Sequence, residues 1–143
     1  VGNLDGAIAE FRTVLRRNPS DVNAHNNLGV TLKAKGDLDG AIAEYRTAAS
    51  LQPNDVNAHF NLGLGLMEKH QPEAAITEFR TALHLRPNDA KLRLNLGNAL
   101  ADVGQRMEAA QELRQYLRLE LDTPATRRWL EQAEAKLREL EMP

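Results

Sequence analysis

The sequence predicts an all-α fold: a solenoid of stacked antiparallel helix pairs that ends in a C-terminal capping helix. The first basis is a repeated stretch, since residues 21–29 read DVNAHNNLG and residues 55–63 read DVNAHFNLG. The second basis is that prolines, glycines and alanines keep the same thirty-four-residue spacing along most of the chain. A period of this length is typical of architectures in which each helical unit packs only against its neighbours.

The repeat register predicts one solenoid domain over residues 1–143. Its parts are the second half of a truncated repeat at 2–20, repeats at 21–54 and 55–88, a degenerate last repeat at 89–121 and a capping helix at 123–141. Because the first part lacks its helix partner, we expect the native chain to continue N-terminally or to begin with a disordered segment.

The first helix of each unit follows an aspartate that caps it. Asp21, Asp55 and Asp89 stand where a carboxylate accepts hydrogen bonds from unpaired backbone N–H groups. Gly36 and Gly104 suit the left-handed turn that ends this helix, whereas His70 takes that place in the middle copy.

The second helix of each unit is bounded by proline. Pro72 begins one such helix at a position that needs no N–H group, and three such helices end before Pro19, Pro53 and Pro87. Small residues recur where the two helices of a unit approach closely, and Tyr45 and Phe79 fill the volume between pairs. The small residues are Gly29, Gly63, Gly97, Ala41, Ala75 and Ala109.

The C-terminal segment predicts a helix that caps the last repeat. Thr123 is expected to cap it and Pro124 to occupy its first turn. Trp129, Ala133, Leu137 and Leu140 fall on one apolar stripe, which we expect to cover the last repeat. A dimer or partner surface is the alternative function of this stripe.

The pattern N-L-G, then Ala, an aromatic residue, Ala and Pro resembles the tetratricopeptide repeat (TPR) over roughly residues 2 to 121. The residues that carry it are Leu28, Gly29, Ala41, Tyr45, Ala48 and Pro53, then Leu62, Gly63, Ala75, Phe79, Ala82 and Pro87. The sequence departs from the family at His25 and His59, where Trp or Tyr is usual, and at Tyr116 and Leu121 in the last copy. The resemblance implies a right-handed superhelix whose first helices line a concave groove.

A helical period of ~100° per residue places one set of side chains on that groove. The predicted groove residues are Asn27, Asn61, Asn95, Asn23, Asn26, Val30, Asn57, Phe60, Leu64, Lys91, Leu94 and Asn98. Among them Asn27, Asn61 and Asn95 recur at the repeat spacing, although asparagine is a poor helix former.

The recurring asparagines predict contact with a peptide backbone, because a side-chain amide offers both donors and an acceptor. They resemble the asparagine ladder in the TPR superhelix of O-GlcNAc transferase. With first helices ~10 Å apart and ~3.3 Å per extended residue, three rungs would span about seven to nine peptide residues. The alternative is that these amides brace the repeat by bonding to a neighbouring helix. A carboxylate clamp, the other groove known in the family, is disfavoured because Asn26, Val30 and Asn95 replace its expected Lys, Asn and Arg.

The composition disfavours several other functions. The 18 basic and 20 acidic residues are nearly balanced and aromatics make up 4%, which argues against nucleic-acid and membrane partners. There is no cysteine, and no apolar run approaches the ~20 residues that span a bilayer. His25 and His59, one repeat apart, are too distant to share a metal ion. No nucleophile, phosphate-binding or cofactor motif is present.

The sequence therefore predicts a non-catalytic protein-interaction scaffold, without cofactor or metal, that binds an extended peptide in its groove. We expect a monomer, with a homo-oligomer as the other possibility. The alternatives are a structural or self-assembly module, and a substrate-recruiting arm of a larger enzyme such as a glycosyltransferase. The sequence identifies no compartment.

Overall fold

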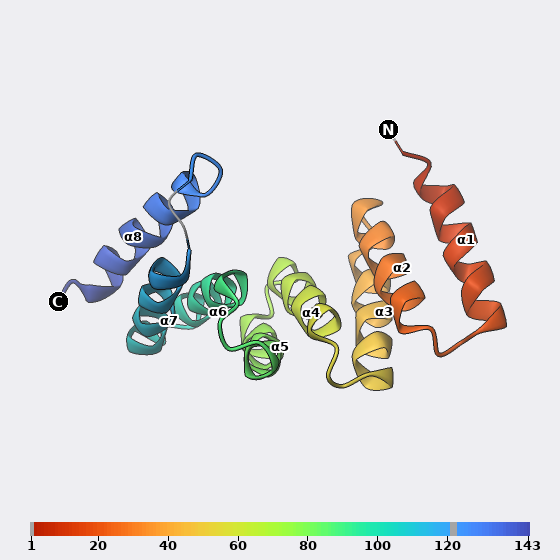
Figure 1. The fold of residues 1–143 in the computed structure, drawn as a ribbon, viewed down its shortest axis with the longest axis horizontal. Coiled ribbons are helices and arrows are strands. Elements are labelled where there is room, and N and C mark those ends of the chain that lie inside the picture. The colour runs from red at the N-terminus through yellow and green to blue at the C-terminus, as the bar shows by residue number, and fades with distance from the viewer. Residues whose placement is uncertain (1, 121–122) are drawn as a thin grey trace. The chain divides into compact units, whose positions relative to one another are not determined.

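The computed structural model describes residues 2–120 and 123–143, and these form helices with no β-strand among them. They divide into two compact units, Val1–Gln71 and Pro72–Pro143. The first contains α1 (Leu4–Arg17), α2 (Val22–Ala34), α3 (Leu38–Leu51) and α4 (Val56–Glu68). The second contains α5 (Pro72–Leu85), α6 (Ala90–Asp102), α7 (Arg106–Leu119) and α8 (Arg127–Glu141) (Figure 1). The all-α fold of antiparallel helix pairs is confirmed.

In each unit, consecutive helices pack against one another, and in the first unit α2 also contacts α4. The division falls between α4 and α5, the two helices of the repeat predicted at residues 55–88. A single solenoid domain and a right-handed superhelix both depend on how the units are arranged, so they stay predictions. The predicted residue Leu121 lies outside the described residues.

The predicted helix caps are present in the structure. The side chains of Asp21, Asp55 and Asp89 accept hydrogen bonds from backbone N–H groups of the first turns of α2, α4 and α6. Left-handed backbone follows these helices at Gly36 (φ 91°), Gly104 (φ 80°) and His70 (φ 56°). Histidine tolerates this conformation less well than glycine, and the next helix begins two residues later at Pro72.

The predicted close approach at glycine is confirmed in both units. A Cβ atom added at Gly29 would lie 2.5 Å from the Tyr45 ring, and one added at Gly97 would lie 3.0 Å from the Leu113 side chain. Tyr45 is 1% exposed and Leu113 is 0% exposed. Glycine on the first helix therefore lets the large residue of the second helix become fully buried.

The capping helix α8 differs from its prediction at its start. It begins at Arg127, three residues after Pro124, because Thr123 and Thr126 form a turn with reciprocal hydrogen bonds. Its C-terminal end is fixed by Arg106, whose Nη2 atom donates to the carbonyl oxygens of Glu139, Leu140 and Met142 at 3.0–3.1 Å. These bonds satisfy backbone carbonyls that have no partner within the helix.

The apolar stripe of α8 is centred on Ala133, which packs in one cluster with Leu113 and Tyr116. Leu130 and Leu140 pack against this cluster as partly buried neighbours. Trp129, by contrast, is 53% exposed, so it covers the last repeat only in part. Leu130, whose side chain points ~100° away from that of Trp129 around the helix axis, packs against the cluster.

Candidate functional site: the exposed faces of the first helices

In the first unit, α2 and α4 present a face of amide and apolar side chains. On α2, Asn23, Asn27 and Val30 are exposed, and Val30 is 49% exposed. On α4, Asn57 is exposed and three residues are half-buried, namely Phe60, Asn61 and Leu64. We call these seven residues the α2–α4 face.

The amides of Asn27 and Asn61 are free for a partner. Neither side chain makes a hydrogen bond to any residue that the structure describes, and both lie in the middle of a helix. Bracing predicts a bond to a neighbouring helix, and no such bond is found for either residue within residues 2–120 and 123–143. Asparagine at these positions therefore does not contribute a hydrogen bond to the fold.

Asn26 is not on this face, which corrects its predicted place in the groove. It is 8% exposed, and its Nδ2 atom donates to Oδ2 of Asp55 at 2.8 Å. The bond links α2 to the cap of α4, whose Oδ1 atom accepts from the Asn57 backbone. The Oδ1 atom of Asn26 is buried with no partner among the described residues. Asn26 thus serves packing between consecutive repeats.

In the second unit, the corresponding face of α6 carries Lys91, Leu94, Asn95 and Asn98. Lys91 and Asn98 are exposed, whereas Leu94 and Asn95 are half-buried. The Nδ2 atom of Asn95 donates to the carbonyl oxygen of Lys91 at 2.8 Å, which is a bond within α6 itself. Asn95 therefore differs from Asn27 and Asn61, because one amide N–H is already used locally.

The exposed Trp129 lies beside this face of α6. It follows Asn95 by thirty-four residues, so it occupies on α8 the repeat position of the asparagines. A cavity of about 440 Å³ opens between α6, α7 and the start of α8. Its lining residues are Lys91, Leu94, Asn95, Asn98, Tyr116, Glu120, Ala125, Thr126 and Trp129. We call this the Trp129 cavity; the sequence prediction missed it because Trp129 was placed on the buried stripe.

Tyr116 forms part of the wall of the Trp129 cavity. It replaces the alanine that stands at this repeat position in Ala48 and Ala82, and it is 2% exposed. Burial, together with the nearby Glu120 carboxylate, raises the pKa of the Tyr116 phenol. Its hydroxyl makes no hydrogen bond within the described part of the chain, so it remains a neutral donor at the cavity.

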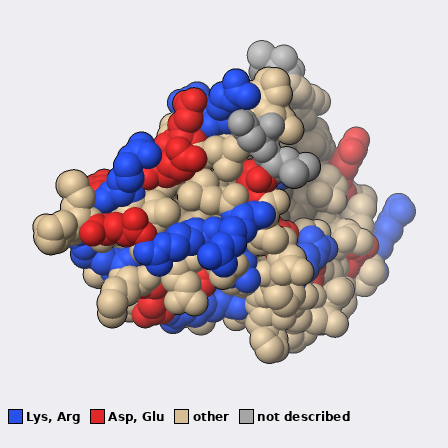
Figure 2. Space-filling model, turned by 60° about the vertical axis from the view of Figure 1, so that its left-hand side comes forward, with Lys and Arg blue, Asp and Glu red and all other residues tan. Residues whose placement is uncertain are grey.

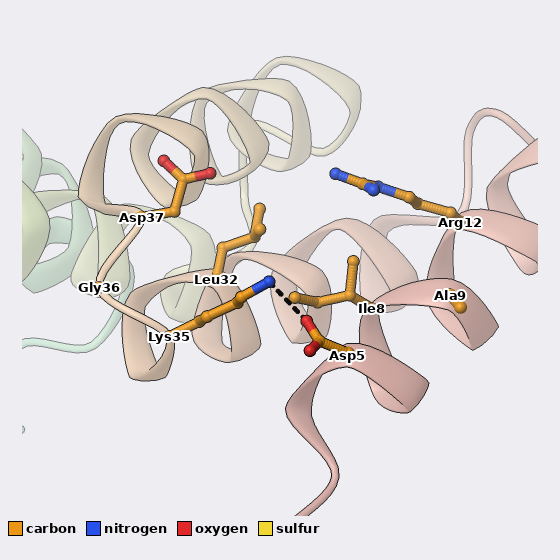
Figure 3. Close-up of a pocket in the computed structure, with 8 residues that line it drawn as sticks. All are labelled: Asp5, Ile8, Ala9, Arg12, Leu32, Lys35, Gly36 and Asp37. Atoms are coloured by element: carbon orange, nitrogen blue, oxygen red, sulfur yellow. Dashed lines mark hydrogen bonds and ion pairs between the residues drawn. The ribbon is translucent and has the colours of Figure 1, made fainter.

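A second cavity, of about 450 Å³, lies in the first unit between α1 and the turn from α2 to α3 (Figure 3). It is lined by Asp5, Ile8, Ala9, Arg12, Leu32, Lys35, Gly36 and Asp37. The Lys35 ammonium pairs with Asp5 at 2.5 Å, and Lys69 pairs with Asp39 in the same repeat register. This cavity therefore lies at the interface between consecutive helix pairs, and the Lys35–Asp5 ion pair bridges it on one side.

The histidines at the same position of two repeats bind the backbone of the preceding turn. His25 Nε2 donates to the carbonyl oxygen of Pro19 and His59 Nε2 to that of Pro53, each at 2.9 Å. In the described ranges, no group of three or more His, Cys, Asp and Glu residues is placed to bind a metal ion. None of the described helices is long and apolar enough to cross a membrane.

Charged side chains of both signs lie next to one another over much of the face shown in Figure 2. Ion pairs on the protein surface include Arg80 with Glu108 and Lys33 with Glu68, each at 2.6 Å.

Helix pairs that follow a thirty-four-residue period define an α-helical repeat protein. A family profile described as the TPR repeat matches residues 2–36, 31–69 and 65–104, and the chain belongs to this family. The matched residues end before α7, where the last copy departs from the repeat pattern.

Solved structures give the same fold. A crystal structure of MamA has a TM-score of 0.80 at 20% identity, covering 97% of this chain and 87% of that chain. A second MamA structure has a TM-score of 0.81 at 22% identity, covering 97% and 78%. The Yersinia enterocolitica type III secretion chaperone SycD, solved with a peptide of the translocator YopD, has a TM-score of 0.77 at 15% identity, covering 83% and 91%. No curated protein sequence matches the chain.

Proposed function

We propose that this TPR protein is a non-catalytic interaction scaffold that binds a partner as an extended peptide along its first helices. The observation that carries the proposal is the pair Asn27 and Asn61. Their amides are not used by the fold, and they sit at the same repeat position on the contacting helices α2 and α4. A side-chain amide matches the donor and acceptor of a peptide unit.

Apolar side chains beside these amides support a peptide over a small polar metabolite. Val30, Phe60 and Leu64 lie on the same α2–α4 face, so side chains of a peptide can pack there while its backbone meets the amides. The SycD structure, which holds a peptide on the same fold, is consistent with this mode. A face this short supports weak binding, on the order of micromolar.

The experiment compares two sets of asparagine variants. A library of nonapeptides is bound to the wild-type protein, and the selected peptides are titrated against Asn27→Ala/Asn61→Ala/Asn95→Ala. We expect this variant to lose binding while circular dichroism stays native. Asn54→Ala/Asn88→Ala is the control, because these exposed asparagines lie in the turns between repeats. Unchanged binding by the triple variant would contradict the proposal, and loss of its helical signal would assign the asparagines to the fold.

Self-association is the second candidate. Sedimentation velocity over a range of concentrations separates the two functions, since a self-associating protein does not remain monomeric at high micromolar concentration.

A further inference from the structure

We propose that the Trp129 cavity is an anchor site for one large apolar side chain of a bound peptide, flanked in the peptide by an acidic residue that pairs with Lys91. This inference rests on the proposed peptide-binding function. It specifies which side chains the bound peptide should carry, whereas the asparagines are proposed to contact only the peptide backbone.

The apolar part of the site comes from Trp129 and Leu94. Both residues line the cavity of about 440 Å³, and both also line a neighbouring cavity of about 250 Å³ between α6 and α8. Trp129 therefore stands between two recesses with more than half of its surface exposed. The exposed half of the indole offers a strong contact to a partner, because aromatic residues dominate binding hot spots.

The polar groups around the cavity suit a peptide backbone. Asn98 is exposed and makes no hydrogen bond to a described residue, and the Oδ1 atom of Asn95 is not used by the bond that its Nδ2 atom makes. The buried Tyr116 has a hydroxyl that is free to donate. These groups offer donors and acceptors next to an apolar recess, which is the composition typical of ligand sites.

The acidic preference follows from Lys91. This residue lies in the first turn of α6, directly after Ala90, where the helix dipole disfavours a cation. The corresponding residues of the other first helices are Asn23 and Asn57. No ion pair joins Lys91 to another described residue, and Lys91 lines the cavity with its side chain exposed. A carboxylate of the partner would form an ion pair with this ammonium group.

The test begins with a synthetic library of N-acetylated, C-amidated nonapeptides, so that no terminal carboxylate is read. Peptides selected on the wild-type protein are expected to share an aromatic or large aliphatic residue next to Asp or Glu. Trp129 is the only tryptophan of the chain, so its fluorescence reports directly on the cavity. Binding of these peptides should shift its emission to shorter wavelength and protect it from acrylamide quenching.

Two variants and two controls complete the test. Trp129→Ala should weaken binding by about tenfold or more, as for a hot-spot residue. Lys91→Glu should weaken binding of acidic peptides and favour peptides with Lys in the same place. Met107→Ala, which removes a residue 87% exposed, and Arg46→Glu, which makes the same charge change on α3, should bind as the wild type does.

The outcomes separate this inference from the proposed function. Peptides that bind the wild type without an anchor preference, and leave the Trp129 emission unchanged, would overturn the anchor site while peptide binding stands. Failure to select any peptide would overturn both. The emission measurement needs no substitution, so it decides the question even where a variant fails to fold.

Discussion

Arg93 on α6 binds the backbone of Pro87, which lies in the turn between α5 and α6: its Nη2 atom lies 2.7 Å from the Pro87 carbonyl oxygen. Its Nη1 atom lies 2.7 Å from Oε2 of Glu112 on α7. In the first unit His25 makes the same two contacts, to the Pro19 carbonyl at 2.9 Å and to Glu44 at 2.6 Å. In α2 and in α6, one side chain thus joins the incoming turn to the second helix of its repeat.

Removing Arg93 should destabilise the protein, because it leaves the Glu112 carboxylate without its counter-ion in a largely buried place. The two side chains are only 17% and 18% exposed. We expect Arg93→Ala to lower the free energy of unfolding by about 1–3 kcal/mol. Urea unfolding measures this effect.

A double-mutant cycle with Glu112→Gln isolates the Arg93–Glu112 interaction. If the pair carries the effect, Arg93→Ala should cost clearly less when Glu112 is already replaced. Equal costs in both backgrounds would show that the bond to Pro87 is what matters.

Much of the fold follows from local residues, which is why it could be predicted. Asp21, Gly36 and Pro72 act through their own backbone neighbours, so their positions alone predict where helices begin and end. The link made by Arg93 was not predicted, although the register of His25, His59 and Arg93 contained a signal for it. Histidine and arginine are different residue types, so the sequence does not mark them as equivalent. Their equivalence becomes evident only when both helices are in place, because both side chains then bind the corresponding backbone carbonyl and a glutamate of the second helix.

Replacing Gly29 by alanine should destabilise the first unit. The new Cβ would lie 2.5 Å from a ring that is itself 1% exposed, so neither group can move without disturbing the core. We expect Gly29→Ala to lower the free energy of unfolding by about 1–3 kcal/mol, as overpacking does. Thermal and urea unfolding measure the change.

A second substitution tests the cause of that loss. Leu113 faces Gly97 where Tyr45 faces Gly29, so Tyr45→Leu should recover part of the stability that Gly29→Ala loses. Gly2→Ala is the control, since a Cβ there meets nothing within 4 Å. An unaltered loss in the double variant would show that the alanine acts through some other contact.

The stability of the protein should fall at alkaline pH partly through Tyr45. Burial and the Glu68 carboxylate raise the pKa of Tyr45 to about 12, whereas the unfolded chain has the ordinary value near 10. Between these values the unfolded state loses the phenol proton and the folded state keeps it. The contribution is therefore complete below pH ~10 and is lost as the pH rises toward about 12, at up to ~1.4 kcal/mol per pH unit.

Tyr45→Phe should remove this part of the pH dependence. Phenylalanine stands at the same repeat position in Phe11 and Phe79, and the Tyr45 hydroxyl makes no hydrogen bond to a described residue, so little change is expected at pH 7. Urea unfolding at pH 8, 10 and 11 compares the two proteins. Parallel curves would show that Tyr45 does not titrate differently in the folded state.

The candidate site was predicted less completely than the fold, because the sequence does not determine how each helix is rotated about its own axis. The side chains of adjacent helix residues point ~100° apart around the helix axis. A small rotation of the helix therefore decides whether a given residue belongs to the predicted face. Asn26 was placed on the groove but lies between α2 and α4, and Trp129 was placed on the buried stripe but lies beside α6. The rotation of each helix is set by its neighbours, which no single helix sequence encodes.

The neighbouring residues Asn26 and Asn27 should therefore respond oppositely to alanine. Asn26→Ala removes the bond to Asp55 and leaves a space between α2 and α4, so we expect a loss of about 1–3 kcal/mol in the free energy of unfolding. Asn27→Ala removes an exposed side chain that makes no hydrogen bond to a described residue, and alanine is the better helix former. It should leave stability unchanged or raise it by about 0.5 kcal/mol.

Peptide titration of the same two variants completes the comparison, because stability and binding should separate. Asn27→Ala should weaken peptide binding without loss of stability, whereas Asn26→Ala should lose stability and, where it remains folded, bind peptide as the wild type does. Asn23→Ala, on the exposed side of the same helix, serves as the matched control for stability. A loss of stability in Asn27→Ala would show that the recurring asparagine stabilises the fold. The proposal that its amide is available to bind a partner peptide would then fail.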